Sequence, residues 1–167
     1  PQWGGPHRNF LADATGLADS WPPAGPPEIW SRPLGLGHST IVVDDRRLYT
    51  MYRPHLEGAP RNRWAEEELV IALDATTGET VWEYAYPAEP LNFRFGEGPH
   101  ATPLVVEDRL FTSGTNKQIH AFDKHTGRVL WSHDLVAEYG APPTLIRPAV
   151  TAGYACSPLS YKNTVIV

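Results

Sequence analysis

Residues 72–82, ALDATTGETVW, recur downstream as residues 121–131, AFDKHTGRVLW. The first copy carries Ala72, Asp74, Gly78 and Trp82, and the second carries Ala121, Asp123, Gly127 and Trp131 at the same spacing. The copies lie about 50 residues apart, and a fixed period of this size indicates a solenoid, a propeller or an array of repeats. This repeat decides the fold class.

A second element also recurs along the chain. Residues 98–111, GPHATPLVVEDRLF, align without a gap to residues 153–166, GYACSPLSYKNTVI, and a looser copy occupies residues 39–49. Each copy reads as an apolar run, a short polar turn and another apolar run. That pattern predicts a β-hairpin.

The stretch that contains the Ala-x-Asp motif predicts a second hairpin in each unit. Residues 70–73 and 119–122 are rich in strand formers. The Asp side chain after each run can accept hydrogen bonds from the backbone amides just ahead of it. The Gly four residues later suits a turn position with positive φ. Two hairpins in each unit make four strands, which is the blade of a β-propeller.

The unit count predicts an all-β partial propeller of four-stranded antiparallel blades. Blade 1 is expected at about 39–86, blade 2 at about 101–135 and the start of blade 3 at about 156–167. Upstream, Glu28-Ile29-Trp30 is expected to form an outer strand, and residues 1–27 an extended arm with a Pro-rich linker. A complete ring would have roughly 7–8 blades, so the remaining blades of the same or another chain are needed to close it.

The repeated motif resembles the tryptophan-docking motif of the quinoprotein-type (PQQ-like) β-propellers. The opening residues 3–8, WGGPHR, and Ile29-Trp30 are similar to the start of bacterial PQQ-binding-like repeat proteins. The resemblance implies that Trp82 packs on Ala72 and Trp131 on Ala121, each beside the Gly peptide of a neighbouring blade. A large aromatic side chain lies flat only where the residue opposite is small.

The resembled family contains proteins of two functional classes. Some members are dehydrogenases that use pyrroloquinoline quinone (PQQ) with calcium, and others are scaffolds without a cofactor, such as an outer-membrane assembly lipoprotein. Because one fold hosts both, function has to be argued from a site. The resemblance also implies a periplasmic or other extracytoplasmic location.

Composition excludes some function classes. The net charge is −5, from 14 basic and 19 acidic residues, and no basic stripe supports nucleic-acid binding. No apolar run approaches the ~18 residues of a membrane-spanning helix. The first residues carry no signal-peptide pattern, so a signal was either cleaved before Pro1 or never existed. A single cysteine, Cys156, permits no internal disulfide.

Candidate binding residues lie on the loops expected to surround the central funnel, at residues 52–67, 87–99 and 136–154. In the first of these loops, Arg53, Arg61 and Arg63 suit a carboxylate clamp, which would fit a tricarboxylate such as PQQ. The adjacent acidic residues 66–68 favour local ion pairs instead.

The starts of the innermost strands supply two histidines as candidates. His38 and His100 are expected to face the funnel, either as donors to a cofactor or in a structural role, but they do not occupy equivalent repeat positions. Glu97 and Asn92 carry the oxygen ligands that calcium prefers. Such residues are too common in loops to predict a metal site, and no catalytic residue is assigned.

Two functional hypotheses follow. The first is a non-catalytic binding or scaffold module that engages protein partners through the funnel-face loops and the N-terminal arm, with no cofactor. The alternative is an alcohol or sugar dehydrogenase that depends on PQQ and Ca²⁺. The first is preferred because no enzyme-specific residue occurs in this stretch.

Overall fold

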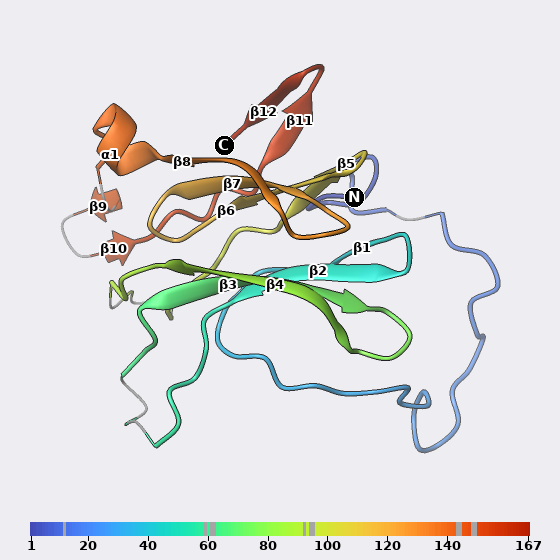
Figure 1. The fold of residues 1–167 in the computed structure, drawn as a ribbon. Helices are drawn as coiled ribbons and strands as arrows, with labels where there is room; N and C mark the ends of the chain where they lie inside the picture. Colours follow the sequence, from blue (N-terminus) through green and yellow to red (C-terminus); the bar gives the residue numbers. More distant parts are fainter. Residues whose placement is uncertain are drawn as a thin grey trace.

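The chain folds into two four-stranded antiparallel sheets, followed by two short hairpins (Figure 1). The computed structural model describes residues 1–167 except positions 12, 59, 61, 62, 92, 94, 95, 143, 144, 148 and 149. At 145–147 and 150–152 only the backbone is described.

The first sheet pairs its strands in chain order. Its members are β1 (Val42–Asp44), β2 (Arg47–Tyr52), β3 (Glu67–Asp74) and β4 (Thr80–Pro87). Neighbouring strands in the chain are neighbours in space, so the sheet is a simple meander. Its β2–β3 loop and the end of β4 lie at one end of the sheet, and its β1–β2 and β3–β4 turns lie at the other.

The second sheet repeats the same order. Its members are β5 (Leu104–Val106), β6 (Arg109–Ser113), β7 (Gln118–Asp123) and β8 (Val129–Asp134). The two sheets lie face to face (Figure 1). The prediction of an all-β chain built from four-stranded propeller blades is confirmed, and the sheets are called blade 1 and blade 2 from here on.

Two hairpins and one short helix follow blade 2. They are α1 (Leu135–Tyr139), β9 (Leu145–Arg147) with β10 (Val150–Ala152), and β11 (Leu159–Tyr161) with β12 (Thr164–Ile166). Residues 136–154 were expected to form a loop, but most of α1 and both β9 and β10 lie in this stretch. The Asp134 side chain caps the helix by accepting from the amides of Val136 and Ala137, and Gly140 ends it at φ 65°.

The core lies between the facing blades. Its buried members come from both sheets: Val42, Tyr49, Met51, Val70, Ala72, Trp82, Tyr86, Ala88, Val105, Leu110 and Phe122. An ion pair joins the blades at the turn end, where Lys124 Nζ lies 2.7 Å from Asp44 Oδ2 and 3.0 Å from Asp45 Oδ2. The core is therefore an interface between repeats, since each blade alone would expose one face.

The β3–β4 turn forms as the sequence predicts. Asp74 Oδ1 accepts hydrogen bonds from the amides of Thr76 and Thr77 at 2.8 and 3.0 Å. These bonds lower the pKa of Asp74. Gly78 then adopts φ 74°, a left-handed conformation that costs glycine little. The β7–β8 turn repeats this arrangement around Asp123 and Gly127.

Two tryptophans link successive repeats through these turns. Trp82 Nε1 donates to the Lys124 carbonyl at 2.8 Å, and its ring covers Gly127, where a Cβ would lie 2.6 Å from the indole. Trp30 sits on the blade 1 turn in the same way, with Nε1 donating to the Ala75 carbonyl at 3.1 Å. The register also places Trp82 opposite Ala72, and Trp131 opposite Ala121.

Two details differ from this pattern. Trp131 is 39% exposed, whereas Trp82 is 8% exposed. The expected outer strand at Glu28–Trp30 is wrong, because these residues form no strand in the structure. A strand needs a partner for its ladder hydrogen bonds, and Trp30 is held by its side chain on the turn of blade 1 instead.

Candidate functional site

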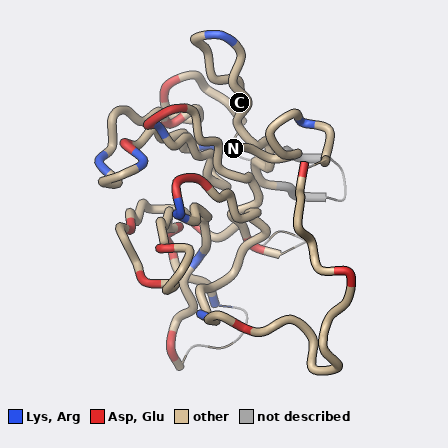
Figure 2. The backbone as a smooth tube through the Cα atoms, turned by 90° about the vertical axis from the view of Figure 1, so that its right-hand side faces the viewer, with Lys and Arg blue, Asp and Glu red and all other residues tan. Residues whose placement is uncertain are grey.

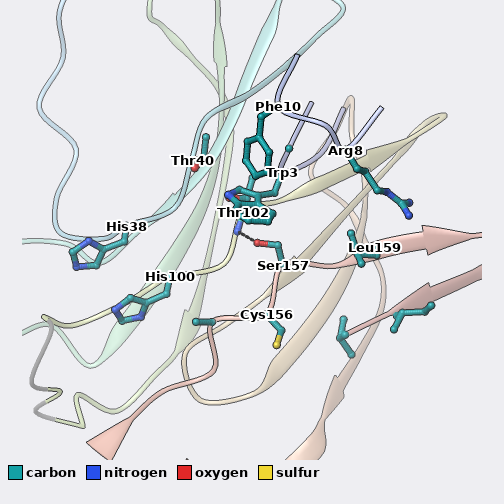
Figure 3. A pocket seen from close by; sticks show the side chains of 14 residues that line it. Trp3, Arg8, Phe10, His38, Thr40, His100, Thr102, Cys156, Ser157 and Leu159 are labelled. Carbon is teal, nitrogen blue, oxygen red and sulfur yellow. Dashed lines mark hydrogen bonds between the residues drawn. The ribbon is translucent and has the colours of Figure 1, made fainter. Parts of the chain in front are cut away.

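A cavity of about 700 Å³ lies where the starts of the innermost strands meet the N-terminal residues (Figure 3). The residues that line it are mostly apolar, aromatic or small: Trp3, Gly4, Arg8, Phe10, His38, Thr40, His100, Thr102, Ala155, Cys156, Ser157, Leu159, Ile166 and Val167. Its size is typical of a site for a small molecule or for a few side chains of a partner. We call it the funnel pocket.

One wall of the pocket is formed by equivalent positions of successive repeats. Thr102 precedes β5 and Ser157 precedes β11, at matching places in the two aligned segments. The amide of Thr102 donates to Ser157 Oγ at 2.9 Å, which joins blade 2 to the next hairpin (Figure 3). The innermost strands of successive repeats therefore begin side by side at the pocket.

His38 and His100 form a second wall. Their rings stack with centroids 4.9 Å apart and an interplanar angle of 11°. The amide of His38 donates to the Pro99 carbonyl at 2.8 Å, which holds the two segments together. Burial, and then the neighbouring charge of His38, lower the pKa of His100. Its buried Nδ1 has no hydrogen-bond partner among the described residues.

The third wall comes from the first ten residues of the N-terminal segment. Residues 1–10 are called the arm from here on. Trp3 and Phe10 pack edge to face with centroids 4.9 Å apart. Arg8 Nη2 donates to the Ser160 carbonyl of β11 at 2.6 Å. The carbonyl of Pro1 accepts from the amide of Val105 in β5 at 2.8 Å. The arm therefore lies along the edges of the innermost strands.

The structure stacks His38 on His100, a contact that the sequence did not predict, and it places Arg53 elsewhere. Arg53 is fully buried inside blade 1, where it donates to the carbonyls of Ala65 and Ala88, each at 2.6 Å, and to Glu68 Oε1 at 3.1 Å. Arg53 does not line the funnel pocket. Its predicted role in holding a cofactor stays a prediction.

The partner of Arg53 is itself enclosed. Glu68 Oε2 accepts from the Tyr86 hydroxyl at 2.8 Å and from the amide of Thr115 at 3.1 Å. Burial, and then the charge of Glu68, raise the pKa of Tyr86 well above its usual value. Arg61 lies outside the described residues, and Arg63 is exposed.

The residues considered for calcium do not assemble into a site in the described part. The Glu97 carboxylate accepts from the amides of Leu91 and Phe93 at 3.2 and 3.1 Å, and Asn92 lies outside the described residues. No group of three or more His, Cys, Asp or Glu able to hold a metal occurs where the chain is described.

The donor set of the funnel pocket does not fit the quinone cofactor with calcium. Its described lining includes no carboxylate, which is the ligand calcium prefers. Its one guanidinium, that of Arg8, already donates to a backbone carbonyl. A tricarboxylate would need more cationic partners than this lining offers.

Acidic residues modestly outnumber basic ones, 19 to 14, and the two kinds are mixed along the chain. Figure 2 shows basic and acidic segments interspersed along the backbone, without a long run of either sign. Such a surface lacks the basic stripe that binds nucleic acid. None of the described helices is long and apolar enough to cross a membrane.

The pocket residues of the arm and of the third repeat were not predicted from the sequence as site residues. Trp3, Arg8 and Phe10 were expected only as part of an extended N-terminal arm, and Ser157 only as part of a hairpin. Two aromatic residues and an arginine close to Gly4-Gly5 are a usable signal, because glycines let a short segment turn back on itself.

A family model described as the outer membrane protein assembly factor BamB, of the PQQ-like repeat type, matches residues 66–166. The chain belongs to this PQQ-like repeat family. The match covers both hairpin types of the repeat and therefore agrees with the observed blades. No curated protein shows a significant match to the chain.

Several solved structures resemble this PQQ-like repeat protein. BamB from Moraxella catarrhalis is 17% identical, with TM-score 0.44, and the match covers 76% of this chain and 34% of that one. The quinohemoprotein alcohol dehydrogenase of Comamonas testosteroni is 19% identical, with TM-score 0.46 and coverage of 79% and 17%. A europium-containing methanol dehydrogenase is 22% identical, with TM-score 0.38 and coverage of 56% and 14%. The chain spans about a third or less of the length of each of these proteins.

Proposed function

We propose that this PQQ-like repeat protein is a non-catalytic module that binds protein partners. The observation that carries the proposal is the funnel pocket, one wall of which is a polypeptide segment of the same chain. That segment is held by the Pro1 carbonyl on Val105 and by Arg8 on the Ser160 carbonyl. The edges of the innermost strands therefore offer backbone groups that suit a peptide.

The loop end of the blades supplies further exposed contact area. The β2–β3 loop of blade 1 runs over residues 53–66, whereas the equivalent loop of blade 2 spans only residues 114–117. His55 and Glu89 are exposed at this end. Long loops on a rigid sheet are common places for recognition, so we assign the partner contacts to this loop end and to the arm.

The alternative is a dehydrogenase that depends on PQQ and calcium, because the wider fold family hosts such enzymes. The described lining of the funnel pocket does not favour it, since no carboxylate is present there. An extracytoplasmic location is part of the proposal and rests on the family resemblance.

Site-specific photo-crosslinking tests the proposal. A photoreactive amino acid placed at His55 or Glu89 is expected to form an adduct with a distinct polypeptide in cells that make the protein. Thr77 and Arg128 are the matched controls, because both are exposed on the turns at the opposite end. Adducts of equal yield at all four positions, or none at the loop end, contradict the proposal.

The enzyme alternative has its own assay. Purified protein is mixed with PQQ and Ca²⁺, and dye reduction is followed with alcohols and sugars. Turnover that depends on both additions replaces the scaffold proposal with the enzyme one. Calorimetry without detectable PQQ binding removes the enzyme alternative.

A further inference from the structure

The N-terminal arm is a folded loop with exposed anchors. Backbone hydrogen bonds from Phe10 to the Gly4 carbonyl and from Arg8 to the Gly5 carbonyl close it. Trp3 remains 52% exposed and Phe10 67% exposed, although both line the cavity. Further burial of either side chain would be favourable, because both are large and mostly apolar. The arm therefore contacts the pocket, but it leaves much of the cavity empty and both aromatic side chains more than half exposed.

The connection from the arm to blade 1 leaves the arm free to be exchanged. Residues 13–29 are exposed except for Gly25, and in Figure 1 this stretch loops away from both sheets. A stretch of chain with little burial is ordered weakly. Exchange of the arm therefore leaves the core between the blades intact.

We propose that the funnel pocket is a docking site for a polypeptide segment, and that the arm is its resident occupant, which a partner segment displaces. The proposal rests on the proposed function and adds the site and the chemistry of the partner. The partner segment supplies a backbone carbonyl to the Val105 amide, a guanidinium to the Ser160 carbonyl and aromatic side chains to the cavity.

The strand edges explain why the occupant is a polypeptide. β5 is the first strand of its sheet, so one of its edges has no neighbouring strand of blade 2. Its Val105 amide is satisfied by the Pro1 carbonyl, which is a main-chain contact. Any other polypeptide can offer the same carbonyl, because strand addition uses groups that every residue carries. The aromatic and arginine positions then provide specificity.

The covalent link between the arm and blade 1 determines how strongly the arm competes with a free segment for the pocket. A flexible tether keeps the arm at an effective concentration in the millimolar range near its own site. A free segment of equal intrinsic affinity therefore binds the intact chain poorly. Removal of the two aromatic anchors lowers the occupancy by the arm and opens the pocket to a segment added in solution.

A labelled peptide with the sequence of residues 1–10, PQWGGPHRNF, tests the site by fluorescence anisotropy with the full chain. The double variant Trp3→Ala with Phe10→Ala is expected to bind this peptide at least tenfold more tightly than the unsubstituted chain. Trp21→Ala is the matched control, because Trp21 is exposed in the connection between the arm and blade 1 and does not line the pocket. It is expected to bind like the unsubstituted chain.

A second readout reports the position of the peptide. Cys156 is the single cysteine and lines the pocket, so a fluorophore attached there is expected to change its emission when the peptide binds. A peptide with Arg8→Ala is expected to bind the double variant about tenfold more weakly, as the loss of one charge-assisted hydrogen bond predicts.

The outcomes separate this proposal from the proposed function. Peptide affinity that is no greater for the double variant than for Trp21→Ala overturns the docking site. So does peptide binding that leaves the emission at Cys156 unchanged. If cross-linking at the loop end succeeds while the peptide fails, the protein-binding function stands and only the pocket assignment is rejected.

Discussion

At the residue scale, one glycine decides how closely the blades approach. The Trp82 indole lies against the backbone of Gly127, and a Cβ there would stand 2.6 Å from the ring. The same residue has φ 72°, which L-residues with a side chain adopt only at a cost. The close approach of the indole and the left-handed backbone conformation are therefore two independent reasons for glycine at position 127.

Substitution of Gly127 by Ala separates these two effects. Gly140 has φ 65° and open space around it, so Gly140→Ala adds only the conformational strain of about 1–2 kcal/mol. Gly127→Ala is expected to lower the free energy of unfolding by about 1–3 kcal/mol more, because it also displaces the indole. Urea unfolding of both variants measures the difference. Equal losses would contradict the packing explanation.

At the element scale, a buried ion pair ties the long β2–β3 loop to its blade. Arg53 bridges the carbonyl of Ala65, at the end of the loop, to the carbonyl of Ala88, just after β4, while Glu68 at the start of β3 neutralises its charge. Both side chains are fully buried. Either charge, if it were buried here without the other, would lower the stability of the protein.

A charge-neutralising pair of substitutions tests this network. Arg53→Met leaves the buried Glu68 carboxylate without its cationic partner and is expected to lower the free energy of unfolding by about 3–5 kcal/mol. Adding Glu68→Gln removes the charge and keeps an oxygen for the Tyr86 hydroxyl and the Thr115 amide. The double variant is expected to be more stable than Arg53→Met, by about 1 kcal/mol or more. Chemical denaturation checks the order, and a double variant that is less stable contradicts the account.

At the scale of the whole molecule, aromatic side chains of the two blades interleave. His120 of blade 2 lies among Tyr84 and Tyr86 of blade 1 and its neighbour Phe122, with ring centroids between 4.7 and 5.6 Å from its own. It is 5% exposed. Burial lowers the pKa of His120 to about 4, so the imidazole is neutral in the folded protein.

Because His120 is buried at the interface between the blades, the stability of the protein is expected to fall at acid pH. The folded state takes up the His120 proton only near pH 4, whereas an unfolded histidine takes it up near pH 6.5. The stabilising contribution is complete above about pH 6.5, and it is lost as the pH falls towards 4, by up to about 1.4 kcal/mol per pH unit. His120→Phe is expected to flatten thermal stability over this range relative to the unsubstituted protein.

His125→Phe is the matched control for that experiment, because His125 lies on the exposed β7–β8 turn. It is expected to keep the acid sensitivity of the unsubstituted protein. Thermal unfolding at several pH values between 4 and 7 provides the comparison. If His120→Phe shows the same pH profile as the unsubstituted protein, other groups cause the loss of stability at acid pH.

The two tryptophans of the repeat are expected to differ in their contribution to stability. Trp82 joins blade 1 to blade 2, and Trp82→Ala is expected to lower the free energy of unfolding by about 3–5 kcal/mol. Trp131 is 39% exposed, and Trp131→Ala is expected to cost about 1 kcal/mol. Thermal and urea unfolding measure both. Similar losses of unfolding free energy in the two variants would contradict the view that Trp82 stabilises the protein mainly through its contact with blade 2.

The repeat pattern accounted for most of the fold. The spacing from Asp74 to Trp82, and its copy from Asp123 to Trp131, encode a local turn that needs only neighbouring residues. The candidate site was harder to predict. His38 and His100 both line the pocket, and their role towards a cofactor stays a prediction. The local ion pair expected between Arg53 and residues 66–68 forms with Glu68, but the burial of Arg53 also depends on the Ala88 carbonyl, which is distant in the chain.

The sequence by itself determined the four-stranded units, their turns and their order, because hydrogen bonds within a hairpin and a fixed period act over short stretches of chain. Only the tertiary structure decided which face of each unit is buried, which arginine is enclosed and where the N-terminal arm lies. The physical reason is that these features depend on contacts between segments far apart in the chain. Arg8 on the Ser160 carbonyl is one such contact, and no local pattern of residues encodes it.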